Sequence, residues 1–386
     1  MSRKILLLTT VKWPSAARLA GAFSALGCTV EAAFPPGHVL GVSRYLSRAH
    51  GYSALRGRAS FSAAICDSEP DLIVPCDDRA VTHLLALAAT MPEIAPLLER
   101  SMGDMASYPV MMTRSQAIAA ARDEGITAPL SLAVADEAEL ERALDVTGLP
   151  AVLKTDGSWG GDNVAVVPTV EEARLALRRL RRASSPLRKL TRAVLRKDAH
   201  FLRAVATPAA VRVHVQGFVR GEPATSAFAC RDGEVLAALH MDVVAWQGAT
   251  GPASLIRRTD CAAMDGAARK IARRFRLSGL HGLDFMRDEE GVSHLIEINP
   301  RATQICHLAL SGCDLAAALV GEAARPAITD KPLIALFPQA WVGNAAGPNA
   351  PEAFLDVPWD DPATLEAWKD GPSGQATRPM AVLRAG

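Results

Sequence analysis

A carboxylate, an amide and an arginine lie close together in residues 294–301, HLIEINPR. On a β-strand, Glu297 and Asn299 are two residues apart and therefore project from the same face. Asp284 precedes Glu297 by 13 residues and reaches that face if the chain between them forms a hairpin. Because carboxylate and amide oxygens suit a hard cation, the sequence predicts a magnesium site with Asp284, Glu297 and Asn299 as ligands.

Arg301 follows directly after Pro300, which ends the expected strand. This position is the mouth of the predicted metal site, where a guanidinium can stabilise a phosphoryl group in transfer. The alternative interpretation is an antiparallel strand pair with solvated polar side chains. That alternative leaves the inward-facing cluster of two acids and an amide unexplained.

A second group starts at Lys154, at the end of an apolar run, and continues through a Gly-rich turn over residues 155–161. Glycines let backbone N–H groups point into a concavity that binds anions, and a flanking lysine adds positive charge. Taken alone, the pattern is weak evidence, because a plain hairpin turn has a similar composition.

These motifs must be positioned by an alternation of strands and helices. The expected strands are 4–9, 29–34, 71–75, 150–154, 164–167, 211–219, 224–229 and a hairpin of 283–286 with 293–298. The expected helices are 15–26, 61–66, 79–89, 114–124, one that begins at Thr169, and 260–276. The first strands and helices alternate, which favours an open parallel α/β sheet. No G-x-G-x-x-G follows the first strand, so we expect no dinucleotide site there. Residues 37–58 and 240–258 are expected as loops.

The two motifs, in this order and about 140 residues apart, resemble the ATP-grasp family over roughly residues 110–325. The resemblance implies an α/β protein with an N-terminal parallel-sheet domain, residues 1–109, followed by a two-subdomain ATP-grasp fold, residues 110–325. The small subdomain that covers ATP is expected at about 145–222, with a basic insertion at 174–203. Residues 326–386 are expected as an irregular C-terminal tail packed on the body.

The resemblance also implies roles for individual residues. Arg301 and Lys154 are the expected catalytic residues, and Asp284, Glu297 and Asn299 match the family's Mg²⁺ ligands. Residues 157–161 correspond to the flexible loop over the phosphates, and residues 215–222 resemble the hinge that holds adenine. The expected nucleotide-binding residues are Arg114, Lys154, Gly157, Ser158, Trp159, Gly160, Gly161, Gln216, Phe218, Val219 and Glu222.

The chain departs from the family pattern in three places. Gly217 stands where many members have a glutamate, and Pro223 follows Glu222, near the usual ribose-binding acid. Gly282 stands where several ligases have an arginine that grips the substrate. That grip must then come from elsewhere, and the candidates are Arg257, Arg258, His240, Gln304 and His307. Each histidine, His281 included, is a lone histidine near an apolar stretch, which favours a core histidine over an acid–base group.

Taken together, the resemblance implies an ATP-dependent ligase with ATP and Mg²⁺, or Mn²⁺, as cofactors. The enzyme would phosphorylate a small carboxylic acid to an acyl phosphate and couple it to an amine or similar nucleophile, so that a carbon–nitrogen bond forms. One alternative activates bicarbonate, as carboxylases and carbamoyl-phosphate-forming relatives do, although we find no biotin-carrier or glutaminase-like motif. The other is a non-catalytic nucleotide-binding scaffold, which would not need the complete set of acids, amide and arginine.

Composition narrows the class of protein further. A net charge of +1 over 386 residues gives no overall preference for nucleic acid or membranes, and no apolar run is long enough to span a bilayer. Residues 1–8 fit a buried first strand better than a signal peptide. Seven cysteines without metal-ligand spacing indicate free thiols in a reducing cytoplasm. We expect a cytoplasmic homo-oligomer.

Residues 174–203 are the local exception in charge, with eleven Lys or Arg and one acid, Asp198. Leucines recur between these charges at roughly helical spacing. One interpretation is a solvated helical face. The other is a contact surface for an acidic carrier or partner protein, an anionic substrate or a lipid surface.

Overall fold

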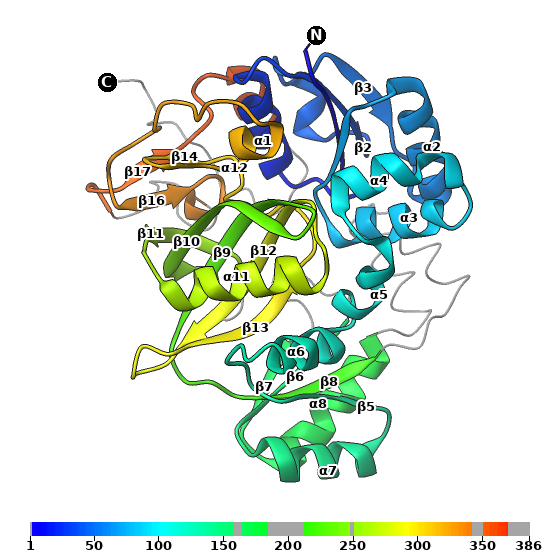
Figure 1. Cartoon of the computed structure of the whole chain (residues 1–386). Coiled ribbons are helices and arrows are strands. Elements are labelled where there is room, and N and C mark those ends of the chain that lie inside the picture. Colours follow the sequence, from blue (N-terminus) through cyan, green and yellow to red (C-terminus); the bar gives the residue numbers. More distant parts are fainter. Residues whose placement is uncertain (1, 157–163, 184–211, 248–250, 342–349, 370–386) are drawn as a thin grey trace.

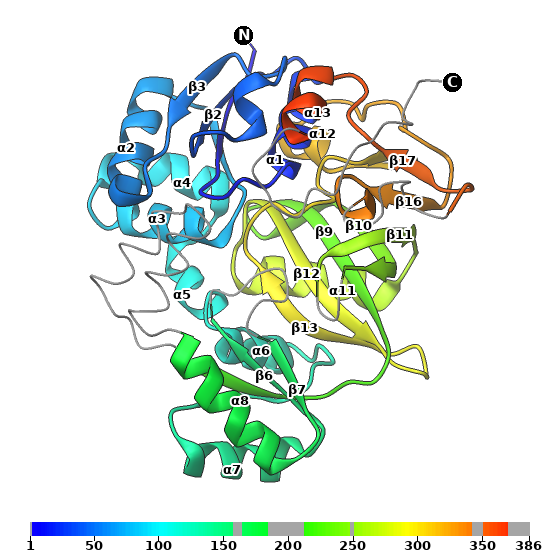
Figure 2. The same cartoon turned by 180° about the vertical axis from the view of Figure 1, so that it is seen from behind.

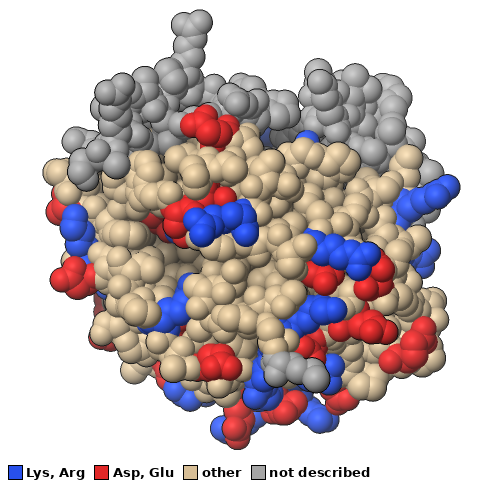
Figure 3. All heavy atoms as spheres, turned by 90° about the horizontal axis from the view of Figure 1, so that it is seen from above, with Lys and Arg blue, Asp and Glu red and all other residues tan. Residues whose placement is uncertain are grey.

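The computed structural model describes residues 2–156, 164–183, 212–247, 251–341 and 350–369. Within them the chain forms a four-stranded N-terminal sheet, a seven-stranded central sheet, a second four-stranded sheet and a two-stranded ribbon (Figure 1). The predicted class, an N-terminal parallel sheet followed by mixed α/β structure, is confirmed. Acidic and basic side chains are interspersed on the face seen in Figure 3, in keeping with the small net charge.

The N-terminal sheet is parallel throughout, in the order β3-β2-β1-β4. Its elements are β1 (Lys4–Leu8), α1 (Ser15–Ser24), β2 (Thr29–Phe34), β3 (Arg48–Gly51), α2 (Gly57–Ser68), β4 (Leu72–Pro75), α3 (Asp78–Ala88) and α4 (Ala95–Met102). Alternate residues of β1 point to opposite faces. Ile5 and Leu7 pack with Phe23 of α1, whereas Leu6 and Leu8 pack with Phe61 of α2. The strand is apolar on both faces because helices cover both.

The expected loop over residues 37–58 was wrong in part. This segment contains η1 (Val39–Val42), β3 and η2 (Ala54–Arg56). Strand β3, with the sequence RAHG, is an edge strand that is mostly exposed and pairs only with β2. It therefore lacks the apolar run by which a buried strand is recognised in a sequence.

The second four-stranded sheet is antiparallel in the order β5-β8-β6-β7. It consists of β5 (Ser131–Val134), β6 (Ala151–Thr155), β7 (Val164–Val167) and β8 (Val213–Gly217), and it packs against α7 (Glu137–Thr147) and α8 (Val170–Ala183). On α8, Ala173, Leu177 and Leu180 recur at helical spacing and are buried against this sheet. The Glu172 backbone N–H donates to Thr169 Oγ1 at 3.2 Å, so the helix begins at its predicted cap.

The central sheet has the order β13-β12-β9-β10-β11-β16-β17 and is antiparallel apart from the last pair. Its elements are β9 (Glu222–Arg231), β10 (Glu234–Trp246), β11 (Ala253–Arg258), α11 (Ala262–Arg274), β12 (Gly279–Arg287), β13 (Ser293–Asn299), α12 (Leu315–Val320), β16 (Leu333–Leu336) and β17 (Phe354–Asp356). Helix α11 packs on one face, while α12 packs on the other together with α1 (Figure 1).

Two expectations are corrected here. Residues 240–258 are mostly strand, since β10 runs to Trp246 and β11 begins at Ala253. The C-terminal part is not an irregular tail. Strand β16 pairs with β11, so that Ile334 lies opposite Ile256, 78 residues earlier in the chain. Strand β17 extends the sheet, and α13 (Pro362–Lys369) contacts η1 (Figure 2). The apolar run LIAL of β16 is a local strand signal, but nothing local specifies its distant partner.

The remaining elements are short or connect the sheets. They are η3 (Pro92–Ile94), η4 (Met105–Ser107), α5 (Tyr108–Met111), α6 (Arg114–Asp123), β14 (Ala309–Leu310), β15 (Cys313–Asp314) and η5 (Gln339–Trp341). All seven cysteines are free thiols, as expected. Among the described helices, none alone has the length and apolar composition to cross a membrane, although the bent pair Asp78–Ala88 and Pro92–Met102 would pass that test if joined.

Asp77 ties together the carboxyl ends of β1 and β4. Its carboxylate accepts hydrogen bonds from Thr9 Oγ1 (3.0 Å), from the backbone N–H of Thr10 (2.6 Å) and from Thr10 Oγ1 (2.8 Å). It also accepts from the Ala80 backbone N–H at 2.9 Å and so caps α3. The first residue of α3 is thereby held at the edge of the sheet that faces the central sheet.

We expect Asp77→Ala to lower the free energy of unfolding by about 3 kcal/mol, because it leaves the buried backbone N–H and hydroxyl of Thr10 without their acceptor and removes a helix cap. Asp77→Asn, which keeps one acceptor oxygen, should cost less. Urea denaturation of the two variants tests this, and a loss below about 1 kcal/mol for Asp77→Ala would contradict the role of the carboxylate.

Candidate functional site

The hairpin of β12 and β13 places the predicted metal ligands on one face of the central sheet. Asp284 lies opposite Glu297, and a register shift next to this pair leaves Ile296 without a partner on β12. In a regular strand, Leu295, Glu297 and Asn299 would all share one face. The bulge separates them: Leu295 is fully buried in the core, whereas Glu297 and Asn299 lie on the face of Asp284.

The two carboxylates are held by hydrogen bonds and repel each other. Asp284 accepts from Thr225 Oγ1 at 2.9 Å and from Asn299 Nδ2 at 2.8 Å. Burial raises the pKa of Asp284, and the neighbouring Glu297 carboxylate raises it further. Two acids and an amide oxygen on one face fit a divalent cation such as Mg²⁺, which would relieve this repulsion. Among the described residues, no three His, Cys, Asp or Glu side chains form a metal site by themselves, so ligand oxygens would share the coordination.

Arg301 is held on both sides. Its Nη2 donates to Asn299 Oδ1 at 3.1 Å, and its Nε donates to Asp78 Oδ1 at 2.8 Å. Asp78 is the first residue of α3, so the N-terminal sheet fixes the arginine at the end of β13. The sequence analysis missed Asp78. Its position three residues after the end of parallel strand β4, where sites in open α/β sheets gather, is the signal that could have identified it.

Arg114 joins the site from the start of α6. Its Nη1 donates to Glu297 Oε2 at 2.8 Å, although 183 residues separate the two. The Arg114 backbone N–H donates at 3.1 Å to Asp156 Oδ1, at the end of β6. His214 Nε2 lies 2.8 Å from the same oxygen. Asp156 therefore connects the start of α6 to the strand that carries the predicted phosphate lysine.

Lys154 lies in β6 and connects the two sheets through a glutamine. Its Nζ donates to Gln216 Oε1 at 2.8 Å, and Gln216 Nε2 donates to the carbonyl of the bulge residue Ile296 at 3.4 Å. The side chain of Lys154 is buried. Burial lowers the pKa of the Lys154 ammonium group to about 8. The negative charge of Glu297 acts in the opposite direction, and the positive charge of Arg114 lowers the pKa further.

The connection between the two sheets is short. Residues 218–221 alone link β8 to β9; Phe218 and Glu222 are exposed, and Val219 is half-buried. A side chain at Gly221 would overlap the Arg287 carbonyl oxygen, so only glycine fits this close approach. The link follows Gln216 directly, and its role as the hinge that holds adenine stays a prediction.

Several candidates for gripping substrate lie elsewhere. On β9, Thr225 lies on the face of the site, because it contacts Asp284. The next residue, Ser226, lies on the opposite face, and its Oγ is 2.8 Å from His240 Nδ1. His240 therefore lies behind the sheet. So does His281, which packs against Phe228, and whose pKa burial lowers to about 4. Arg257 and Arg258 lie on β11, with β9 and β10 between them and the acids of the site.

The remaining predicted positions have different outcomes. Gly157, Ser158, Trp159, Gly160 and Gly161 lie outside the described residues, as do residues 184–203 of the basic segment. At Gly282, an added Cβ would overlap Thr303 Cγ2, so the arginine of several relatives has no space here. Gln304 Oε1 accepts from Gln339 Nε2 at 2.7 Å, and His307 Nε2 lies 2.9 Å from Asp356 Oδ2.

No family model and no curated protein matches the sequence. Solved structures do match the fold. The biotin carboxylase domain of 2-oxoglutarate carboxylase from Hydrogenobacter thermophilus, in complex with MgADP, ADP and bicarbonate, has a TM-score of 0.61 at 14% identity, covering 85% of this chain and 71% of that one.

Two further matches have different activities in their names. Carboxyaminoimidazole ribonucleotide synthase from Aspergillus clavatus, complexed with ATP, has a TM-score of 0.61 at 15% identity, covering 84% of this chain and 78% of that one. L-amino acid ligase from Bacillus licheniformis has a TM-score of 0.60 at 13% identity, covering 82% and 75%. All three are ATP-grasp proteins.

The low pKa of Lys154 predicts proton uptake when a nucleotide binds. Phosphate oxygens next to the ammonium should raise its pKa above about 8. At about pH 8.5 the free protein then holds a partly neutral lysine that binding recharges, whereas at about pH 6 the lysine is charged in both states. Calorimetry of ADP binding in two buffers with different ionisation enthalpies measures this uptake.

Lys154→Met should abolish the uptake, and Lys270→Met, at a surface lysine that donates to the Glu124 carbonyl, should leave it unchanged. Equal uptake at both pH values, or uptake that persists in Lys154→Met, would contradict the assignment of Lys154 to the phosphates.

Proposed function

We propose that this chain, which has the ATP-grasp fold of these three neighbours, is an ATP-dependent ligase. It would phosphorylate a small carboxylic acid to an acyl phosphate and couple it to an amine or similar nucleophile. The observation that carries the proposal is the convergence of Lys154 and Arg114 on the pair of acids Asp284 and Glu297, between two sheets. A concentration of buried opposite charges in this arrangement suits the binding of a charged ligand.

The phosphates of ATP would lie between β6 and the β12–β13 hairpin. Lys154 would act as a point charge on the phosphates, and the guanidinium of Arg114 would add a planar set of donors. Arg114 would exchange the Glu297 carboxylate for phosphate oxygens, and Lys154 would exchange the Gln216 amide oxygen. Adenine would lie by the link that follows Gln216, with Phe218, Val219 and Glu222 nearby.

Asp284, Glu297 and Asn299 would hold Mg²⁺, with Mn²⁺ as an alternative ion. Such an ion neutralises phosphate charge when bound. The chain contributes the oxygen ligands, and Thr225 and Asn299 orient the Asp284 carboxylate through their hydrogen bonds.

Arg301 would stabilise the phosphoryl group in transfer. An oxygen of the substrate carboxylate attacks the γ-phosphorus, ADP leaves, and the nucleophile then attacks the acyl carbon and displaces phosphate. Because such chemistry depends mainly on positioning and charge, a firmly held guanidinium is the main requirement at this position. Asp78 and Asn299 hold it on either side.

We extend the proposal to the domain organisation of the sequence analysis. Residues 145–222 would form the subdomain over ATP, residues 157–161 would cover the phosphates, and the basic segment 174–203 would offer a positive surface to an acidic partner. The sheet of β5 to β8 and its short link to β9 support the first of these roles.

A bicarbonate-activating enzyme is the second candidate. One neighbour binds bicarbonate together with MgADP. Position 282 is a glycine packed against Thr303, so this chain has no arginine there to grip a larger carboxylate. The absence of that arginine side chain is compatible with a smaller acid as substrate. A phosphate-release screen over amino acids, small carboxylates and bicarbonate, each with a panel of amines, separates the two.

Glu297→Gln should reduce turnover by about 100- to 1000-fold. The substitution removes the negative charge that would coordinate Mg²⁺ and that pairs with Arg114. The fold should persist, since glutamine has the same shape and the position is only partly buried. Coupled ADP release measures turnover, and Glu290→Gln, at the exposed tip of the same hairpin, is the matched control. Full activity in Glu297→Gln would remove the metal assignment.

Asp78→Asn should lower kcat by roughly tenfold and leave the affinity for ADP nearly unchanged. The substitution weakens a charged hydrogen bond that positions Arg301, and no phosphate ligand is altered. Asp265→Asn, which breaks a surface ion pair with Arg269, serves as control. A kcat equal to that of the unmodified protein would show that Arg301 does not need its partner from the N-terminal sheet.

A further inference from the structure

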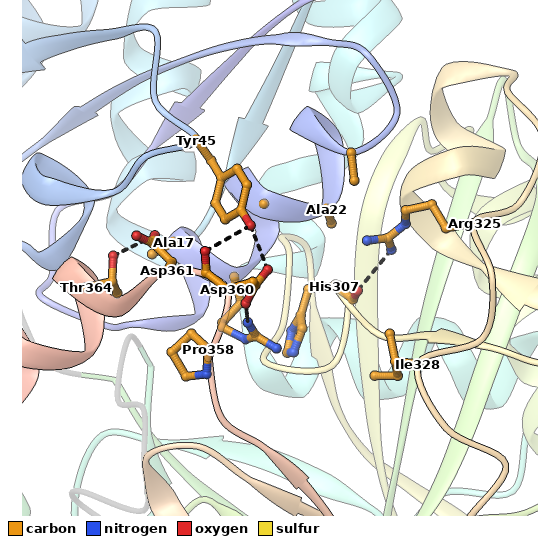
Figure 4. Close-up of a pocket in the computed structure, with 13 residues that line it drawn as sticks. Ala17, Ala22, Tyr45, His307, Arg325, Ile328, Pro358, Asp360, Asp361 and Thr364 are labelled. Carbon is orange, nitrogen blue, oxygen red and sulfur yellow. Dashed lines mark hydrogen bonds and ion pairs between the residues drawn. The ribbon is translucent and has the colours of Figure 1, made fainter. Parts of the chain in front are cut away.

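A cavity lies where the N-terminal and C-terminal parts of the chain meet. It has a volume of about 130 Å³. Its walls come from α1, from Tyr45 after η1, from the segments around His307 and Arg325, and from the loop between β17 and α13 (Figure 4). None of the lining residues belongs to the nucleotide site described above. A cavity of this size has room for a small organic molecule.

Opposite charges stand on opposite walls of this cavity. Figure 4 shows the Tyr45 hydroxyl and the Asp360 carboxylate on one side and the Arg325 guanidinium on the other. Tyr45 donates to Asp360 Oδ2 at 2.7 Å, and the Asp360 side chain is 61% exposed. Burial and this hydrogen bond raise the pKa of Tyr45 to about 12, so its hydroxyl stays protonated.

Arg325 is held firmly yet keeps donors free. Its Nε and Nη2 donate to Asp314 at 2.8 and 3.0 Å, and Nη2 also donates to the His307 carbonyl oxygen at 3.0 Å. These bonds fix the plane of the guanidinium. Within the described residues, Nη1 donates no hydrogen bond, which leaves it available to an acceptor in the cavity.

The back wall is closed by a chain of paired charges. Arg18 Nη2 donates to Asp356 Oδ1 at 2.6 Å, and His307 Nε2 lies 2.9 Å from Asp356 Oδ2. Arg18 Nη1 also forms an ion pair with Asp360 Oδ1 at 3.6 Å, and the Asp360 carboxylate, 61% exposed, can still accept from a ligand.

The charge balance selects the class of ligand. Among the residues that line the cavity, two arginines, Arg18 and Arg325, balance two aspartates, Asp360 and Asp361. A balanced lining of this kind suits a ligand that carries both charges better than a plain anion such as phosphate or a dicarboxylate. A fitting ligand carries a cationic group for Asp360 and an acceptor for Arg325.

Small apolar residues shape the space between these charges. Ala17, Ala22 and Ile328 line it, and an added Cβ at Gly21 would lie 3.2 Å from the Tyr45 ring. Gly21 thus lets Tyr45 pack closely on α1 and present its hydroxyl to Asp360. The apolar area accommodates a short aliphatic side chain and excludes a large one.

We propose that this cavity is a binding site for a small free amino acid, separate from the nucleotide site. Its ammonium group pairs with Asp360 beside Tyr45, its carboxylate accepts from Arg325 Nη1, and its side chain lies between Ala22 and Ile328. His307 lies six residues beyond Arg301, so the bound amino acid rests on the same stretch of chain that carries the phosphoryl-binding arginine.

Calorimetry on the full chain, without nucleotide, tests the proposal with L-alanine and L-serine as probes. Propionate and ethylamine each lack one of the two charges and should bind at least roughly tenfold more weakly. Asp360→Asn should weaken L-alanine binding by a similar factor, and Arg18 keeps its buried partner Asp356 in this variant. Ile328→Trp, which fills the cavity from its edge, should also weaken binding. Thermal melting shows whether each variant is folded.

Matched controls separate this cavity from the nucleotide site. Asp260→Asn, at an exposed aspartate outside the cavity, and Lys154→Ala should both bind L-alanine as the unmodified protein does. Saturating ADP should not displace the amino acid. The proposal is overturned if neither probe binds at millimolar concentration, if propionate binds as well as L-alanine, or if Lys154→Ala loses binding while Asp360→Asn retains it.

Discussion

The repulsion between two partly buried carboxylates governs the arrangement of the whole site. Asp284 and Glu297 face each other across one antiparallel strand pair, where little water screens their charges. Coulombic repulsion at such separation is several-fold stronger near the interior of a protein than in water. The chain compensates it with three cationic side chains, Arg114, Lys154 and Arg301, each from a different element.

Because these cations come from separate parts of the fold, the site exists only when the sheets are packed together. Arg301 depends on Asp78 of the N-terminal sheet, Lys154 reaches the central sheet through Gln216, and Arg114 is placed by the start of α6. A polyphosphate with its metal ion would fit this arrangement of charges. Its negative oxygens would lie next to the cationic side chains, and the positive ion would lie next to the acids. The geometry that stabilises the free protein is therefore also the geometry that can bind such a ligand.

Much of the fold was predictable because its signals are local. The strand before Thr9, the cap at Thr169 and the hairpin containing Asp284 and Glu297 all depend on residues within a few positions of each other. Strand β3 was missed because it is an exposed edge strand with no apolar period of its own. Strand β16 is the apolar run LIAL, so a strand signal was present in the sequence, whereas its pairing with β11 was not. The C-terminal region was wrongly expected to be irregular because this run was not recognised as a strand.

By itself, the sequence determined which chemical groups are present and which neighbours share a strand face, because side-chain direction follows from chain spacing within one element. It thus predicted that Glu297 and Asn299 lie together and that Arg301 follows them. Only the tertiary structure decided that a bulge at Ile296 separates Leu295 from this face, that Asp78 holds Arg301, and that His240 lies behind the sheet. These are contacts between residues far apart in the chain, and they depend on how whole sheets pack, which no local spacing specifies.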